Sequence, residues 1–257
     1  MPVIERYETG MFSWADLATT DVMGAKGFYG ELFGWKFEDH PAGDAGTYTM
    51  ARRDGRDVGG LSGMMPGMRE QGIPPHWTAY FSVEDVSLRS SKVELLGGKL
   101  MMPPMDVMDV GRMCIIEDPT GAKAALWQER GHQGAGVKNE PGTLAWVELM
   151  TQDTAKAQAF YTQLLGWTPD TQQMGPLQYT SFLVGGAPTA GMMKAESGVP
   201  SNWLIYFAVE SCDRSAEQAS KLKAKVKVLP EDIPGVGRFS ILQDPQGAFF
   251  GIIQFTS

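Results

Sequence analysis

The chain has 257 residues and a net charge of −8, with 43% hydrophobic and 20% charged residues. Because a negative charge of this size repels phosphate backbones, we do not expect nucleic-acid binding. No apolar stretch approaches the roughly 20 residues that a membrane span needs. The N-terminal residues lack a cationic-then-apolar signal pattern, so we expect a cytoplasmic protein without a membrane partner.

The first predicted elements are a strand at Phe12–Thr19 and a helix from Asp21 to about Phe33. Asp21 is a favourable helix N-cap, and Gly34 is a residue type that commonly ends a helix. A polar linker, Pro66–Pro75, separates these elements from a second set. The remaining elements expected in this half are strands at Trp35–Glu38, Tyr48–Arg52, Val58–Met64, Trp77–Val83, Lys99–Met102, Arg112–Glu117 and Ala122–Gln128, and a helix at Asp85–Leu96.

The second half of the chain repeats the first. The segment Trp14–Trp35 returns as Trp146–Trp167 with an offset of 132, and 10 of the 22 aligned residues are identical. Later motifs return with an offset of 126. Two copies of one domain are the simplest account of this pattern. We therefore expect domains at 8–130 and 141–257, joined by the glycine-rich, charged linker Glu129–Gly142.

Each predicted domain contains the order strand, helix and three strands twice. A pair of such βαβββ modules can curl a mixed sheet into a cup, with the helices on its convex face. The expected fold class is therefore α+β, with two tandem domains and two cups. The concave face of each cup is then free to hold a small molecule.

The layout resembles the vicinal oxygen chelate superfamily, which includes glyoxalase I, bleomycin-resistance and fosfomycin-resistance proteins, and extradiol dioxygenases. The residues that carry the resemblance are the helix segments Asp21–Trp35 and Asp153–Trp167 and the turns Asp118–Gly121 and Asp244–Gly247. More narrowly, the chain resembles tandem-domain glyoxalase-like proteins of the actinobacterial type. This fold supports many chemistries, so the resemblance implies the fold more strongly than the activity.

The resemblance implies a metal site made of histidine and glutamate side chains from three strands. The corresponding positions are Trp14, Thr78 and Ala125 in the first copy and Trp146, Leu204 and Gly251 in the second. None of these six is a usual ligand, and an indole offers only an N–H donor. We therefore expect neither a metal nor another cofactor in either cup.

Alternation along the predicted strands places one set of side chains on the concave face of each cup. In the first cup, Trp14 and Trp127 would form aromatic walls around the polar pair Asp16 and Tyr80. The other side chains expected to contact a ligand there are His76, Thr78, Met105 and Lys123. In the second cup, the expected aromatic walls and polar pair are Trp146, Phe249, Glu148 and Tyr206.

Two interpretations of the carboxylates remain open. A carboxylate beside a tryptophan can have a raised pKa and act as a general acid or base. Alternatively, Asp16 and Glu148 are hydrogen-bonded to neighbouring tyrosines and hold the cup together, and the tryptophans fill core space. The methionine-rich segment Met101–Met108 is expected to be a lid over the first cup. Its counterpart Val228–Pro234 lacks methionine, which favours the first cup as the functional one.

Three functions are compatible with this pattern. The first is metal-independent binding of an aromatic or polyketide-like metabolite for resistance, sequestration or carriage. The second is a metal-free isomerase, lyase or cyclase of secondary metabolism, with Asp16 or Glu148 as the base and Tyr80 or Tyr206 as its partner. The third is a glyoxalase or dioxygenase with an unrecognised metal set. The protein would be a monomer with an internal pseudo-dimer or a homodimer.

Overall fold

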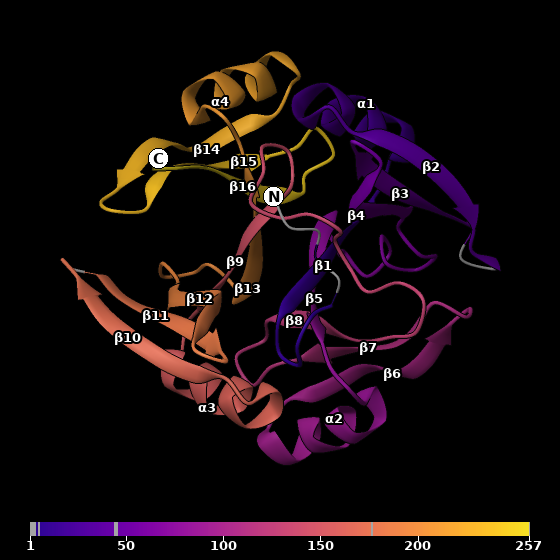
Figure 1. Cartoon of the computed structure of the whole chain (residues 1–257), viewed down its shortest axis with the longest axis vertical. Helices are drawn as coiled ribbons and strands as arrows, with labels where there is room; N and C mark the ends of the chain where they lie inside the picture. Colours follow the sequence, from indigo (N-terminus) through magenta and orange to yellow (C-terminus); the bar gives the residue numbers. More distant parts are fainter. Residues whose placement is uncertain (1–3, 5, 44–45, 176, 257) are drawn as a thin grey trace.

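The computed structural model describes residues 4, 6–43, 46–175 and 177–256. These residues form two eight-stranded mixed sheets, one from each half of the chain. The strand order is β2-β3-β4-β1-β5-β8-β7-β6 in the first sheet and β10-β11-β12-β9-β13-β16-β15-β14 in the second. Identical order in the two sheets confirms the duplicated α+β fold (Figure 1).

The elements of the first half follow the predicted order. They are β1 (Phe12–Thr19), α1 (Val22–Phe33), β2 (Lys36–Pro41), β3 (Thr47–Arg53), β4 (Arg56–Gly63), β5 (His76–Ser82), α2 (Val86–Val93), the short 3₁₀ helix η2 (Glu94–Leu96), β6 (Lys99–Val107), β7 (Gly111–Glu117) and β8 (Lys123–Glu129). The second half repeats them with β9 (Leu144–Thr151), α3 (Thr154–Leu165), β10 (Thr168–Met174), β11 (Leu177–Val184), β12 (Ala187–Lys194), β13 (Asn202–Ala208), α4 (Cys212–Lys221), β14 (Lys225–Ile233), β15 (Gly237–Gln243) and β16 (Phe249–Phe255).

The first helix has the ends that the sequence predicts. The Asp21 side chain accepts a hydrogen bond from the Gly24 amide, which satisfies one of the free N–H groups of the first turn. Gly34 ends the helix with a φ of 72°, a left-handed conformation that favours glycine. Asp153 and Gly166 serve the same roles in α3. The repeated sequence therefore encodes the same local structure twice.

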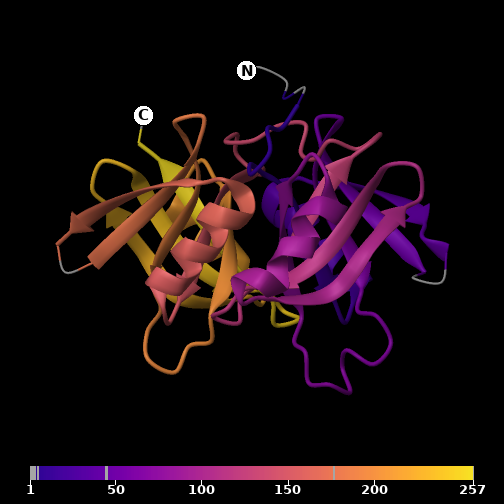
Figure 2. The same ribbon diagram turned by 90° about the horizontal axis from the view of Figure 1, so that it is seen from below.

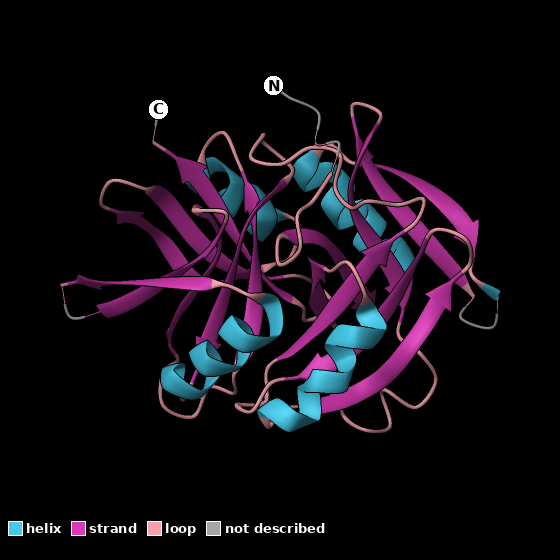
Figure 3. Cartoon of the chain, turned by 60° about the horizontal axis from the view of Figure 1, so that its bottom comes forward, coloured by secondary structure: helices cyan, strands magenta, loops and turns pink. Residues whose placement is uncertain are grey.

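Parallel and antiparallel neighbours meet at the centre of each curled sheet. Strand β1 pairs in parallel with β4 and antiparallel with β5, and β5 pairs in parallel with β8. The second sheet repeats this arrangement around β9. Figure 3 shows the four described helices packed outside the strands. The concave faces are thereby left without helical cover.

A shared aromatic core joins the two halves, which lie side by side in Figure 2. The helices pair across the boundary, α1 beside α4 and α2 beside α3 (Figure 1). Between them, the rings of Phe33 and Phe207 lie 5.0 Å apart and those of Phe81 and Trp203 lie 5.1 Å apart. Such large buried rings contribute strongly to packing at this boundary. The tandem sheets thus form an internal pseudo-dimer.

No helix in the described part of the chain is long and apolar enough to cross a membrane.

Candidate functional site

A chain of hydrogen bonds surrounds the carboxylate of the first cup, by which we mean the concave face around Asp16. The indole N–H of Trp14 donates to the Tyr48 hydroxyl at 2.9 Å. The Tyr80 hydroxyl donates to Oδ2 of Asp16 at 2.7 Å, and the Tyr48 hydroxyl lies near enough to lower the pKa of this carboxyl group. Strands β1, β3 and β5 supply these side chains, so three neighbouring elements hold one carboxylate.

The second cup, the concave face around Glu148, contains the same arrangement. The indole of Trp146 donates to the Tyr179 hydroxyl at 2.9 Å, and the Tyr206 hydroxyl donates to Oε2 of Glu148 at 3.1 Å. The Tyr179 hydroxyl also lies near enough to lower the pKa of Glu148. Each cup therefore contains one tryptophan, two tyrosines and one carboxyl group in the same arrangement. Both interpretations of the carboxylates are geometrically compatible with these contacts.

Burial raises the pKa of the carboxyl group and of both tyrosines in each cup. Desolvation raises the pKa of Asp16 to about 6, although the bonds from Tyr80 and Tyr48 act in the opposite direction. Desolvation likewise raises the pKa of Glu148 above its ordinary value. The tyrosine pKa values rise too, because burial and the adjacent carboxylate both disfavour a phenolate. At neutral pH the tyrosines are therefore hydrogen-bond donors, and Asp16 titrates close to neutrality.

Sequence reasoning missed Tyr48 and Tyr179, which accept hydrogen bonds from the two indoles and lie beside the two carboxyl groups. They lie on β3 and β11, which are separated from β1 and β9 in the sequence. A Cβ atom on Gly60 or Gly191 would overlap the tyrosine hydroxyl of the same cup. The repeated spacing of tyrosine and glycine (Tyr48 to Gly60, Tyr179 to Gly191) was the available signal.

The two carboxyl groups differ in their access to solvent. Glu148 is buried, with 8% of its surface exposed, whereas Asp16 is only partly buried. Asp16 pairs across the sheet with Thr78, while Glu148 pairs with the larger Leu204. The next concave positions are also smaller in the first cup, where Ala18 and Ser62 stand in place of Met150 and Met193. The first cup therefore has more room beside its carboxyl group.

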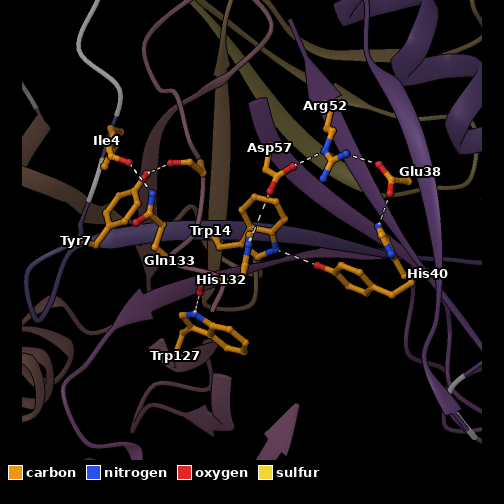
Figure 4. A network of polar contacts seen from close by, with 12 residues as sticks. Ile4, Tyr7, Trp14, Glu38, His40, Arg52, Asp57, Trp127, His132 and Gln133 are labelled. Atoms are coloured by element: carbon orange, nitrogen blue, oxygen red, sulfur yellow. Dashed lines mark hydrogen bonds and ion pairs between the residues drawn. The ribbon is translucent and has the colours of Figure 1, made fainter. Parts of the chain in front are cut away.

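The linker closes the other end of the first cup. The His132 ring lies edge-on to Trp14, with centroids 4.6 Å apart, and the indole of Trp127 donates to the His132 carbonyl at 2.8 Å. Figure 4 shows His132 between the two indoles, with Asp57 and Arg52 beyond it. Trp14 and Trp127 are consequently buried, whereas Trp146 in the second cup is partly exposed.

The remaining predicted residues lie around these groups. Lys123 is exposed at the start of β8, and Phe249, its counterpart on β16, is 45% exposed. His76 pairs with Ala18 at the edge of the cup, and its Nδ1 lies 2.8 Å from the Pro74 carbonyl. Met105 is also exposed. It belongs to strand β6, so the expected methionine lid is wrong: most of this segment is an edge strand paired with β7.

Two surface cavities lie outside the cups, at the seams between helices. One, of about 420 Å³, lies between the end of η2 and α3, and its lining includes Leu95 and Phe160. The other, of about 440 Å³, lies between the end of α1 and the start of α4, and its lining includes Arg53 and Arg214. Neither contains a residue of the two hydrogen-bonded chains.

The concave residues do not fit a metal ion. At the positions where the resemblance implies ligands, Trp14 uses its only polar hydrogen on Tyr48, and Ala125 has no donor atom. The described residues contain no group of three or more histidine, cysteine, aspartate or glutamate side chains that could surround a metal. A divalent cation needs several such ligands converging on it. Hydrogen bonds link the groups that occupy the centre of each cup instead.

Comparison with known families identifies the ancestry of the two halves. The sequence model described as the glyoxalase/bleomycin resistance protein/dioxygenase superfamily matches residues 11–126 and again residues 143–252. The chain belongs to this superfamily. Each match covers the strands and helices of one sheet, so the duplication seen in the structure is a duplication of the family's own unit.

Two of its curated relatives match nearly the whole of this chain. CFP32 of Mycobacterium tuberculosis, which is named provisionally as a glyoxylase, is 43% identical over 257 residues, covering 99% of this chain and 98% of the relative. The anthracycline biosynthesis protein DnrV of Streptomyces peucetius is 34% identical over 261 residues, covering 97% and 94%. Both relatives therefore have the tandem length.

Solved structures share the fold at low sequence identity. The 2,3-dioxygenase LapB of Pseudomonas sp. KL28 superposes with a TM-score of 0.67 at 16% identity, covering 98% of this chain and 94% of that one. The Mn(II)-bound glyoxalase of Novosphingobium aromaticivorans has a TM-score of 0.65 at 14% identity, covering 96% and 82%. These likenesses establish the fold alone.

Proposed function

We propose that this protein binds an aromatic or polyketide-like small molecule in its first cup without a metal ion. One observation carries the proposal: Trp14, Tyr48, Asp16 and Tyr80 gather polar groups on the concave face, and Trp14 stands at a position where the resemblance implies a metal ligand. The carboxyl group at its centre is partly exposed and bordered by small side chains. A concave face with aromatic side chains and a few convergent polar groups suits a planar ligand. The role would be resistance, sequestration or carriage.

The relatives support the choice of ligand class. DnrV is named for anthracycline biosynthesis, and anthracyclines are aromatic polyketides. A fused aromatic ring system with phenolic and quinone oxygens could accept a hydrogen bond from protonated Asp16 or donate one to its carboxylate. Because Asp16 titrates at about pH 6, both forms are populated near neutrality.

Isothermal titration calorimetry of the full chain with 1,8-dihydroxyanthraquinone, in buffer containing EDTA, tests this proposal. We expect saturable binding with one ligand in the first cup. The variant Thr78→Leu should abolish it, since it places beside Asp16 the residue that the second cup carries at Leu204. Binding that Thr78→Leu leaves unchanged would place the ligand elsewhere and refute the proposal.

A second candidate is a metal-free enzyme that transfers a proton, such as an isomerase, lyase or cyclase. The observation that favours it is the pKa of Asp16, which is raised to about 6 and therefore suits a general acid or base. Tyr80 would hold the carboxyl group and steady the developing charge. Asp16→Asn separates the two functions. A binding protein retains its affinity, whereas an enzyme retains affinity but loses turnover by roughly 10²- to 10⁴-fold.

A further inference from the structure

The rim of each cup carries one lysine, but the two copies place it on different strands, β8 in the first sheet and β14 in the second, which is two strands away from β16, the counterpart of β8. Lys123 in the first copy corresponds to Phe249 in the second. Conversely, Met101 in the first copy corresponds to Lys227 in the second. Each cup therefore has one lysine and one apolar side chain at this pair of positions. The position that carries the lysine in the first copy carries the apolar side chain in the second.

The exchange preserves the place of the positive charge as well as its presence. The ammonium group of Lys227 lies over the Phe249 ring, 5.7 Å from its centroid. It is thus held above the residue that replaces Lys123. A cation over an aromatic face is attracted to the ring, which helps to fix its position. Each cup therefore has a lysine either at this position or over its counterpart, although different residues supply it.

These charges are not used by neighbouring acids. The ion pairs found in the described part of the chain include neither Lys123 nor Lys227. Glu117, which pairs with Lys123 across the sheet, lies 2.8 Å from the ammonium group of Lys99 instead. At the corresponding place in the second sheet, Gln243 carries no charge. A lysine at the rim of both cups, free of ion pairs in the described part of the chain, would attract a ligand with a negative charge.

The spacing suits a ligand that also reaches the buried polar group. Asp16 lies on β1, Thr78 opposite it on β5, and Lys123 on β8, the next strand of the sheet. Strands in a sheet are about 4.8 Å apart, so Lys123 begins about 10 Å from Asp16. Two or three fused aromatic rings span this distance. The charged group would then lie at the lysine and the opposite end of the ring system beside the carboxyl group.

We propose that each cup binds an anionic aromatic molecule whose negative group, a carboxylate, sulfonate or ionised phenol, pairs with Lys123 in the first cup and Lys227 in the second. This inference rests on the proposed function, because it assumes that the cups bind small molecules. It adds the charge of the ligand and, in the second cup, a site for anions at the rim beside Lys227 and Phe249, away from Glu148 and the larger Leu204 opposite it.

The test uses two fluorescent probes of the same shape, the anion 8-anilinonaphthalene-1-sulfonate and its uncharged analogue N-phenyl-1-naphthylamine. Each is titrated into the full-length protein and into Lys123→Met, Lys227→Gln and the double variant. Lys92→Gln, which alters an exposed lysine on helix α2, is the matched control. We expect each cup variant to weaken sulfonate binding at its own site by about two- to fivefold, the range for an exposed ion pair. Binding of the neutral probe should be unchanged.

The outcomes separate the two proposals. Both probes could bind while replacing either cup lysine changes the sulfonate affinity no more than Lys92→Gln does. That result would refute an anionic ligand and leave the binding of a small molecule intact. If both probes bind but the double variant weakens them equally, the lysines act through packing and the charge argument fails. If neither probe binds the native protein, the proposed function and this inference fail together.

Discussion

The hydroxyl of Tyr29 in the first half donates a 2.9 Å hydrogen bond to Oδ2 of Asp244 in the second half, 215 positions further along the chain. The indole of Trp77 donates to the same hydroxyl at 3.0 Å. All three side chains are buried. This relay joins helix α1 of one sheet to the turn before the last strand of the other, so it fastens the internal pseudo-dimer.

Replacing Tyr29 by phenylalanine should destabilise the whole chain. The change leaves the indole N–H of Trp77 and Oδ2 of Asp244 without their partner, and each unsatisfied group costs about 1–3 kcal/mol. The pseudo-equivalent Tyr161→Phe is the matched control. Tyr161 accepts from Trp203 at 2.9 Å, but Oδ2 of Asp118 has no hydrogen-bond partner in the described part of the chain. Urea unfolding should therefore show a larger loss for Tyr29→Phe, and equal losses would contradict the asymmetry.

The hydrogen bonds among Trp77, Tyr29 and Asp244 also show which features the sequence alone could predict and which it could not. The repeat, the capped helices and the strand order follow from local patterns, because caps, turns and alternation are encoded within a few residues. Tyr29 and Asp244 each belong to a repeated motif. Their contact depends on how the two copies pack, which no local pattern specifies. Tyr48 beside Asp16 was missed for the same reason, since β3 reaches the site only through its place in the sheet.

The contribution of Asp16 to the stability of the protein should fall as the pH rises. Its pKa is about 6 in the folded protein and 3.8 in the reference state, so folding favours the protonated form. The contribution is complete below about pH 3.8 and is lost as the pH rises through about 6. Asp16→Asn cannot titrate. The unfolding free energy of this variant, measured relative to the native protein between pH 4 and 7, should therefore increase with pH. A constant difference would show that Asp16 has an ordinary pKa.

His132 should act in the opposite direction. Burial lowers its pKa below 6.5, although Asp57 opposes this shift. The neutral ring therefore contributes stability that is present above about pH 6.5 and is lost as the pH falls through its folded value. His132→Gln should lose less stability than the native protein on acidification from pH 7 to pH 5. His76→Gln, at the edge of the same cup, serves as the control. A steeper acid dependence in His132→Gln would rule out a buried neutral ring.

A single mutation can give the second cup the same room beside its carboxyl group as the first. Leu204→Thr gives the second cup the residue that the first carries at Thr78. It should lower stability by about 1–3 kcal/mol, because Leu204 is 2% exposed and packs against Tyr206 and Ile253. It should also add a second calorimetric binding site for the anthraquinone. Unchanged stoichiometry in a folded Leu204→Thr variant would mean that the side chain opposite the carboxyl group does not control access.

The central claim is that hydrogen-bonded tryptophan, tyrosine and carboxyl groups have replaced metal ligands in a ligand-binding cup. Its most direct test compares the calorimetric affinity for 1,8-dihydroxyanthraquinone in protein stripped with EDTA and in protein then supplied with Mn²⁺, Ni²⁺ or Zn²⁺. We predict the same dissociation constant and stoichiometry in all samples, and no binding by Thr78→Leu. Affinity that arises only after one of these ions is added, and is lost again in Asp16→Asn, would contradict the account.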